Sequence, residues 1–486
     1  MKNSIGTDTL KLTTSKMITM AFSLVTAMLL SRFRTLEEYG TYSQLLLVIN
    51  LVTTIFMLGL PNSINFFLAR AENDEEKQNF LSAYYTLTSI LSFITGLVLV
   101  LSTPLIVDYF NNLLIRNFMY VLAVYPWTKI ILSSIDNIYI VYQKTTRLML
   151  FRILNSIFLL LIILIVEIFN WGFSMYMILF ISVEAAFALS VYIIARNIAG
   201  KIRVCLDKDL IKTILTFSIP IGLATAAGTL KTECDKLVIA GFYATEQLAI
   251  YTNAAREMPV AIIASSLTAV LMPQIVRLLK KDDKYKALNL WGNAISLSYL
   301  IICFLATGIF TYAPEVMTLL YSEKYITGVP VFRVYSLVLL FRCTYFGMIL
   351  NSIGKTKIIL YSTVLVLITN VILNFFFYYL FGFIGPAIAT LIVTLFSATY
   401  LLSETSKTLN TSFKKIFPWK NIIYITILNM GLGVVFALAK ELLSLEEKNL
   451  GGVIESIMLG AVWGAIYFAI TFRFMKRKWQ ALNEGD

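Results

Sequence analysis

Histidine is absent from the 486 residues of this chain, and the sequence contains no GxxxxGK[ST] phosphate-binding loop. The first absence excludes a Ser-His-Asp triad, an HExxH zinc site and any metal site built on imidazole. The second excludes ATP hydrolysis at a loop of that type. The connections between apolar segments are also too short to hold a soluble catalytic domain. We therefore predict a protein that is not an enzyme and that binds neither cofactor nor metal.

Charge and cysteine are also scarce. Only 14% of the residues are charged, whereas 58% are hydrophobic and the mean hydropathy is +0.78. A soluble domain has about a quarter of its residues charged, so this composition is typical of a membrane protein. The four cysteines have no CxxC spacing and lie in or beside apolar segments, which predicts reduced thiols packed among helices.

Long apolar segments recur along the whole chain, and each is long enough to cross a hydrocarbon core of about 30 Å. Because backbone groups in lipid must be satisfied within the segment, we expect these segments to be helices. The first segment is too long for a cleavable signal peptide and predicts a first spanning helix. We predict an all-α integral membrane protein with about 14 transmembrane helices, at approximately 10–31, 43–60, 81–101, 118–141, 150–169, 172–195, 213–232, 246–272, 290–312, 329–350, 358–380, 384–403, 421–439 and 452–472.

Lysine and arginine determine the predicted orientation. With the N-terminus in the cytoplasm, most of the 40 basic residues fall on the cytoplasmic side. The outer side has only Arg32, Arg34, Arg116, Lys324, Lys440 and Lys448. Both termini are therefore predicted to be cytoplasmic, and the net charge of +12 reflects this topology. No soluble domain gathers the basic residues, so we expect no binding of nucleic acid.

Two short stretches of the sequence are similar to one another. "SRFRTLEEYGTYSQ" (31–44) and "AGFYATEQLAIYTN" (240–253) each follow an apolar segment predicted to end on the outer side. Their aligned identities are Phe33 with Phe242, Glu37 with Glu246, and Tyr42 with Tyr251. Each stretch leads into a segment that ends in a proline motif, and a polar cytoplasmic stretch follows. The shared order of features predicts a duplicated architecture.

The duplication predicts three parts of the chain. Residues 1–200 would form an N-terminal lobe of helices 1–6, and residues 201–405 a C-terminal lobe of helices 7–12. Residues 406–486 would carry helices 13 and 14 and a cytoplasmic tail. Parallel repeats in transporters place the substrate site near the bilayer midplane between the lobes and permit alternating access.

Several motifs resemble those of bacterial polysaccharide-export flippases, the oligosaccharidyl-lipid branch of the multidrug/oligosaccharidyl-lipid/polysaccharide (MOP) exporter superfamily. "DKLVIAGFYATEQLAIYTNA" (235–254) is similar to the central motif of that family, and "SRFRTLEEYGTYSQ" is similar to its first outer loop. "LYSEKYITGVPVFRV", "NSIGKTK" and "NVILNFFFYYLFGFIGPAIATLI" resemble its motifs before helix 10, after helix 10 and at the helix 11–12 corner. The resemblance covers about residues 5–405.

The resemblance implies a multi-pass flippase of the bacterial plasma (inner) membrane. Such a protein moves an undecaprenyl-pyrophosphate-linked oligosaccharide repeat unit from the cytoplasmic to the outer leaflet during polysaccharide biosynthesis. The implied partners are the lipid-linked oligosaccharide, membrane lipids, and polysaccharide polymerase and assembly proteins.

Transport of a pyrophosphate across lipid requires a wet cavity with fixed positive charge, and lysine or arginine at membrane depth favours such a cavity or a partner. The candidate substrate-binding cations in the apolar segments are Arg256, Lys129, Lys16, Arg342 and Lys231. Four of them have a structural alternative. Arg256 or Lys231 would pair with Asp235, Lys129 would form an interhelical pair or extend to the membrane surface, and Lys16 would extend to the cytoplasmic surface.

Acidic residues at similar depth are Asp136, Glu184, Glu233, Asp235 and Glu257. Asp235 matches the acidic residue of the family motif, and we expect it to lock the structure or to couple transport to protons. Glu184 lies alone in "FISVEAAFA". It is either a protonatable coupling residue or a hydrogen-bonded helix contact.

Two other functions remain open from the sequence. A cation-coupled multidrug exporter of the same superfamily would need acids in its cavity, and drug susceptibility of overexpressing cells separates it from a flippase. A non-transporting scaffold for glycan assembly would tolerate loss of Arg256 but not changes on its helix surfaces.

Overall fold

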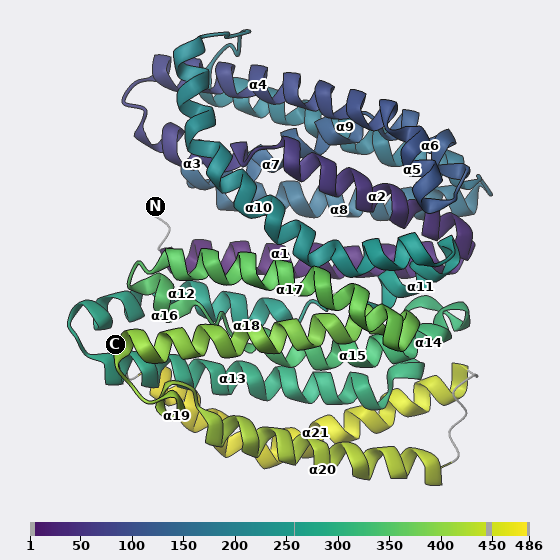
Figure 1. Cartoon of the computed structure of the whole chain (residues 1–486), viewed down its shortest axis with the longest axis vertical. Helices are drawn as coiled ribbons and strands as arrows, with labels where there is room; N and C mark the ends of the chain where they lie inside the picture. The colour runs from purple at the N-terminus through teal and green to yellow at the C-terminus, as the bar shows by residue number, and fades with distance from the viewer. Residues whose placement is uncertain (1–4, 257, 444–449, 484–486) are drawn as a thin grey trace. The chain divides into compact units, whose positions relative to one another are not determined.

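The structure is a computed structural model that describes residues 5–256, 258–443 and 450–483 (Figure 1). Glu257 and Lys448, which the sequence analysis uses, lie outside these ranges. Within them the chain is built from helices, with no β-strand, as predicted. The chain divides into two compact units, Met1–Ala249 and Ile250–Asp486, which are described separately below.

The first unit begins with long helices interrupted by short ones. Its helices are α1 (Ile5–Phe33), α2 (Leu36–Phe56), α3 (Leu60–Arg70), α4 (Asp74–Leu101), α5 (Thr103–Phe110), α6 (Leu114–Leu122), α7 (Tyr125–Val141), α8 (Thr145–Ile168), α9 (Phe173–Ala199) and α10 (Lys208–Phe242). The division between the units falls within α11 (Thr245–Ala254).

The second unit has the remaining helices, several of them short. They are α12 (Ala261–Lys280), α13 (Lys284–Thr311), α14 (Ala313–Tyr321), α15 (Val329–Leu339), α16 (Met348–Ser352), α17 (Thr356–Phe381), α18 (Gly385–Leu409), α19 (Phe413–Ile416), α20 (Trp419–Leu442) and α21 (Leu450–Asn483). Three 3₁₀ turns connect them, η1 (Glu323–Gly328), η2 (Leu340–Cys343) and η3 (Gly382–Ile384).

The structure does not confirm the predicted number of fourteen spans. Among the described residues, 11 helical segments are long and apolar enough to cross a membrane, or up to 12 if one bent pair forms a single span. One of these segments, Thr356–Leu409, contains two helices, α17 and α18, that pack against each other. The membrane-protein class is therefore confirmed.

Three predicted continuous spans are interrupted. The span at 118–141 is bent by 46° between α6 and α7. The span at 246–272 stops at the end of α11 and resumes at α12, with Pro259 between them. Proline lacks a backbone N–H and disfavours helical backbone in the residue before it, which explains this break. The span at 329–350 passes through η2 and an extended residue, Thr344, before α16 begins.

The helix boundaries agree with the predicted repeat. Phe33 ends α1 and α2 begins three residues later, while Phe242 ends α10 and α11 also begins three residues later. The start of α2 has a capping box, because Thr35 Oγ1 accepts from the N–H of Glu38 and the Glu38 carboxylate accepts from the N–H of Thr35, both at 3.1 Å. Such reciprocal bonds satisfy donors that a helix start leaves unpaired. The two aligned stretches thus form the same local structure.

Within the first unit, α10 packs closely against the turn after α2, and the first residue of α11 packs closely against α2 itself. A Cβ atom on Gly222 would lie 2.3 Å from the carbonyl carbon of Leu58, and one on Gly40 would lie 2.1 Å from the carbonyl oxygen of Thr245. Leu58 and Gly59 both have positive φ angles, 49° and 69°, where the chain turns from α2 into α3. Only glycine permits such backbone-to-backbone contact.

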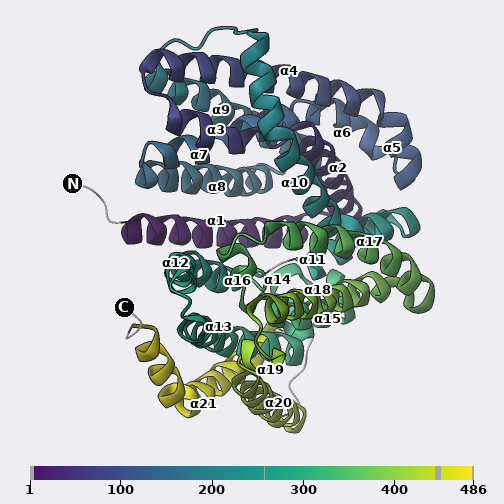
Figure 2. The same cartoon turned by 60° about the vertical axis from the view of Figure 1, so that its left-hand side comes forward.

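The C-terminal helices α20 and α21 pack on α13 in the second unit (Figure 2). Trp463 stacks on Phe436 with ring centroids 5.3 Å apart, and Tyr467 stacks on Phe304 at 5.0 Å. Next to this packing, the ammonium of Lys440 on α20 pairs with the buried carboxylate of Glu315 on α14. An aromatic core and a buried ion pair therefore attach these helices to the second unit.

Candidate functional site

Lys129 lies in the middle of the bent pair α6–α7, in the interior of the first unit. Its ammonium donates a hydrogen bond to Oδ1 of Asn50 on α2. Glu184 on α9 and Glu233 on α10 are the acids that interact with it electrostatically. No carboxylate of the described residues lies within ion-pair distance of the Lys129 nitrogen. Lys129 is therefore a cation at membrane depth whose direct partner is a neutral amide.

Glu184 is engaged with a neighbour other than Lys129. The Nδ2 of Asn155 on α8 donates to Oε1 of Glu184 at 3.2 Å. The Glu184 residue is only 5% exposed. A carboxylate at this depth gains stability from a hydrogen bond to its charged form. The hydrogen-bonded helix contact predicted for Glu184 is thus present, and it links α8 to α9.

Glu233 is paired within its own helix. Its carboxylate accepts from the ammonium of Lys236 at 2.6 Å, one turn along α10. Both residues are half-buried. Because each nearby acid has its own partner, neither cancels the charge of Lys129 by direct contact. We call Asn50, Lys129, Asn155, Glu184 and Glu233 the polar cluster.

Two members of the polar cluster, Glu184 and Asn155, lie near the middle of their helices. At 1.5 Å per residue, Glu184 is about 16 Å from the start of α9 and about 22 Å from its end. Asn155 is about 15 Å from the start of α8 and about 20 Å from its end. A hydrocarbon core is about 30 Å thick, so these side chains lie well inside it. Five helices contribute to one polar site at mid-membrane depth.

A second interhelical pair lies toward the other end of α7. The guanidinium of Arg152 on α8 binds both carboxylate oxygens of Asp136, with a distance of 2.9 Å from Nε to Oδ1. A bidentate pair of this kind fixes geometry as well as charge. Asp136, one of the acids at membrane depth, is thereby assigned to holding α7 against α8.

The other predicted cations lie apart from this cluster in the sequence. Lys16 is exposed on α1, and Arg342 is exposed in η2. Arg256 was expected well inside a helix. It lies instead in the non-helical break between α11 and α12, which also contains Pro259. It is half-buried and has an interaction partner.

Lys231 and Asp235 both lie in α10. Asp235 is 2% exposed, and its Oδ1 accepts from the backbone N–H of Lys236 at 2.8 Å. Lys231 is half-buried, and both residues have further partners. The pairing of Lys236 is with Glu233, so the two acids of "TECDK" have different surroundings.

The sequence did not identify the two amides of the cluster. Asn50 occurs in the otherwise apolar stretch "LLLVINLV", and Asn155 occurs in "FRILNSIF", where Arg152 and Ser156 are also polar. A single asparagine in a spanning helix is unusual because its amide requires a partner. That rule would have flagged both residues, although it would not have named their partners.

No group of three or more metal-binding acid or cysteine side chains occurs in the part of the chain that the structure describes. The four cysteines are free thiols. The polar cluster therefore offers hydrogen bonds and charge at mid-membrane depth.

Comparison with protein families gives one match over more than half of the chain. Residues 29–330 match the model of the family described as "Polysaccharide biosynthesis protein".

Two curated proteins are similar in sequence. An uncharacterized membrane protein of Methanocaldococcus jannaschii is 28% identical over 334 residues, which are 63% of this chain and 64% of that protein. The capsular polysaccharide biosynthesis protein CapF of Staphylococcus aureus is 22% identical over 59% of this chain and 77% of its own length. The chain thus spans just under two thirds of the length of the archaeal relative.

Among the solved structures with a similar fold are a flippase and a multidrug transporter. The lipid II flippase MurJ in an inward closed conformation has a TM-score of 0.76 at 16% identity, over 96% of this chain and 99% of MurJ. An inward-facing multidrug resistance MATE transporter of the MOP superfamily has a TM-score of 0.64 at 17% identity, over 83% of this chain and 99% of its own. At these identities the likeness concerns the fold alone.

Proposed function

The chain belongs to the family of polysaccharide biosynthesis proteins, and on that basis we propose that it is a flippase for a lipid-linked oligosaccharide. Its substrate would be a repeat unit on undecaprenyl pyrophosphate, moved from the cytoplasmic to the outer leaflet by alternating access. The similarity to CapF in sequence and to MurJ in fold supports this proposal. The alternative function is a cation-coupled multidrug exporter. It is supported by the similarity of this chain's fold to that of the MATE transporter.

The observation that carries the proposal is the position of Lys129. Its ammonium lies at mid-membrane depth and is bonded to the neutral amide of Asn50, while Glu184 and Glu233 are bonded elsewhere. A lysine inside a membrane span costs about 3 kcal/mol on insertion scales, so its presence favours a function. An anionic group of a substrate would recover this free energy by binding the ammonium. Lys129 is thus the described cation best suited to a passing pyrophosphate.

The acids of the cluster suggest how transport would be driven. Glu184 interacts electrostatically with Lys129, so a change in the protonation of Glu184 changes the potential at the ammonium. Protonation would strengthen the attraction of Lys129 for an anion, and deprotonation would weaken it. The cluster would in this way couple release of the substrate to a proton or cation gradient.

The experiment uses a strain in which the gene is deleted and the wild type or a variant is expressed at matched level. We expect Lys129→Ala to trap the repeat unit in the cytoplasmic leaflet and to abolish surface polysaccharide, because the cation is lost. Lys129→Arg keeps the charge and should retain part of the activity. Lys281→Ala, which removes an exposed lysine after α12, is the control and should be fully active.

Two outcomes would contradict the proposal. If Lys129→Ala restores surface polysaccharide as well as the wild type does, Lys129 does not handle the substrate. If deletion leaves the polysaccharide unchanged but makes cells more sensitive to cationic dyes, the multidrug exporter is the correct function, and the buried acid Glu184 is then the residue to test.

A further inference from the structure

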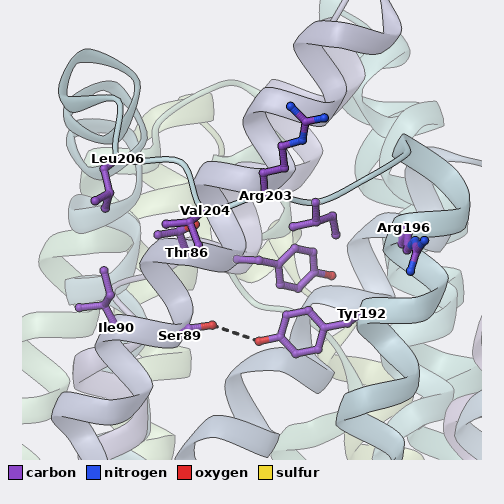
Figure 3. Close-up of a pocket in the computed structure, with 10 residues that line it drawn as sticks. Thr86, Ser89, Ile90, Tyr192, Arg196, Arg203, Val204 and Leu206 are labelled. Carbon is purple, nitrogen blue, oxygen red and sulfur yellow. Dashed lines mark hydrogen bonds between the residues drawn. The ribbon is translucent and has the colours of Figure 1, made fainter.

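A cavity of about 570 Å³ lies on the first unit, between α4, α9 and the linker that joins α9 to α10 (Figure 3). Ten residues line it, from the middle of α4, the last two turns of α9 and residues 202–206 of the linker. Its volume falls within the roughly 300–1,000 Å³ typical of ligand sites. The polar cluster contributes no residue to this cavity.

Side chains of α4 hold the linker beside the cavity. Ser82 Oγ accepts from the backbone N–H of Arg203 at 3.2 Å, and Thr86 Oγ1 accepts from the N–H of Cys205 at 3.1 Å. The amide of Gln78 donates to the carbonyl of Lys201. Because these bonds recur at every second residue, the linker runs extended along α4. Its side chains therefore keep fixed positions at the cavity.

The lining of the cavity changes from charged to apolar. Arg196 and Arg203 lie at its rim, and both are exposed. Tyr192 and Ser89 meet across it, with their hydroxyl oxygens 3.1 Å apart. On the remaining side lie exposed apolar side chains, with Ile90 45%, Val204 81% and Leu206 63% exposed. A ligand with an anionic end and an apolar end would match this order.

The two arginines have no competing acid in the cavity. None of the ten lining residues is acidic, and neither guanidinium forms an ion pair with any residue of the described ranges. Arg196 lies in the last turn of α9, at the end that the distribution of lysine and arginine places on the cytoplasmic side. Basic pockets between spanning helices on that side are suited to anionic lipid headgroups.

We propose that this cavity binds one anionic phospholipid of the cytoplasmic leaflet. Its phosphate would lie between Arg196 and Arg203, which can donate to it bidentately. One acyl chain would cover Ile90 and Leu206, which are otherwise exposed. A bound lipid would join the linker to both α4 and α9, and so hold the start of α10.

The occupant is expected to be a bulk phospholipid and not the polyprenyl carrier. The site is open, and its arginines are exposed, so it should bind weakly and be filled by mass action. Anionic phospholipids are abundant in the cytoplasmic leaflet, which meets that requirement. This inference is independent of the proposed flippase activity.

The test measures thermal unfolding of the purified full-length protein in neutral detergent, with added phosphatidylglycerol or phosphatidylcholine. We expect phosphatidylglycerol to raise the unfolding temperature of the wild type and phosphatidylcholine to have little effect. Arg196→Gln/Arg203→Gln should weaken the apparent binding of phosphatidylglycerol at least tenfold. Ile90→Trp, which fills the apolar side without changing charge, should weaken it to a similar extent. Lys280→Gln/Lys281→Gln removes the same charge from another exposed site and should bind as the wild type does.

Several results would overturn the proposal. If the lysine control loses as much affinity as the arginine pair, the effect is general surface charge. If Ile90→Trp binds normally, the acyl chain does not occupy the cavity. If undecaprenyl phosphate binds at much lower concentration than phosphatidylglycerol, the occupant is the polyprenyl carrier. Native mass spectrometry of the same variants counts bound lipid directly. For any variant whose unfolding temperature without lipid is altered, this count determines whether the variant binds phosphatidylglycerol.

Discussion

The backbones of Leu58 and Gly222 approach so closely that a Cβ atom on Gly222 would lie 2.3 Å from the carbonyl carbon of Leu58. The same Cβ would lie 2.7 Å from the nitrogen of Gly59. Both obstructions are backbone atoms, which cannot rotate away as a side chain would. This contact holds α10 against the turn between α2 and α3.

Gly222→Ala should therefore destabilise the protein by about 1–3 kcal/mol, the usual range for overpacking. Thermal unfolding in detergent measures the change. Gly228→Ala is the matched control, because Gly228 lies in the same helix and a Cβ there would meet no atom within 4 Å. Equal stability of the two variants would show that α10 does not need this close approach.

Asn50→Asp tests the polar cluster more directly. The new carboxylate would replace the amide oxygen that accepts from Lys129, and a charge-assisted hydrogen bond is about twice as strong as a neutral one. We expect the thermal stability to be kept or raised, and the transport of an anionic lipid to fall at least tenfold because the cation is neutralised. The leaflet position of the lipid-linked repeat unit measures transport.

The control for this change is Asn65→Asp on α3. The amide of Asn65 donates to Asn137 at 2.9 Å, and the residue is exposed. It introduces the same charge away from Lys129 and should leave transport intact. Full activity of Asn50→Asp would mean that the free charge of Lys129 is not required.

The buried pair of Glu315 and Lys440 predicts a large effect on stability. Glu315 is 2% exposed, so Lys440→Met would leave a buried carboxylate without its cation. We expect a loss of about 3–5 kcal/mol, with most of it recovered in Glu315→Gln/Lys440→Met. Lys407→Met removes the exposed cation that pairs with the half-buried Glu404 and should cost less than about 1 kcal/mol. Chemical unfolding of the wild type and the three variants gives the comparison.

Asp283 gives the protein one defined dependence on pH. A hydrogen bond from the backbone N–H of Lys286, with a further contribution from the Lys286 side chain, holds the pKa of Asp283 below its ordinary value of 3.8. A lowered folded-state pKa adds stability above the unfolded-state pKa, and that stability is lost as the pH falls through the folded-state value. The carboxylate also caps the start of α13.

Asp283→Asn keeps a capping side chain but removes the ionisation. We expect the wild type to be more stable than Asp283→Asn at neutral pH, and the difference to shrink as the pH falls below about 4. Thermal unfolding at a series of pH values measures it. A difference that stays constant down to about pH 2 would show that ionisation of Asp283 does not contribute.

The sequence predicted the helical class. Its alignment of Phe33 with Phe242 pairs two residues that both end a helix in the structure, but the predicted spans themselves ended at residues 31 and 232. The number of spans could not be predicted from the sequence. Hydropathy measures only how apolar a segment is, and the segments containing Pro259 and Thr344 are apolar throughout. The helix breaks near these two residues therefore leave no signal in the hydropathy.

The candidate site was predicted in part. Lys129 and Glu184 were identified because a charge at membrane depth is costly, and the structure brings both into one electrostatic cluster. The rotation of each helix about its axis decides which partner a side chain meets, and packing sets that rotation. For this reason the bond from Lys129 to Asn50 could not be read from the spacing of residues along the chain.

Helix α10 has 35 residues and is therefore about 52 Å long. The stretch from Pro220 to Phe242 alone is about 33 Å, which already matches the thickness of a hydrocarbon core. The helix must then either tilt or extend its first twelve residues beyond the lipid. Hydrophobic mismatch would act on α10 more than on its shorter neighbours. A thinner or thicker bilayer would therefore change the free energy of tilting α10. A change in that tilt would act on the close contact between Gly222 and Leu58.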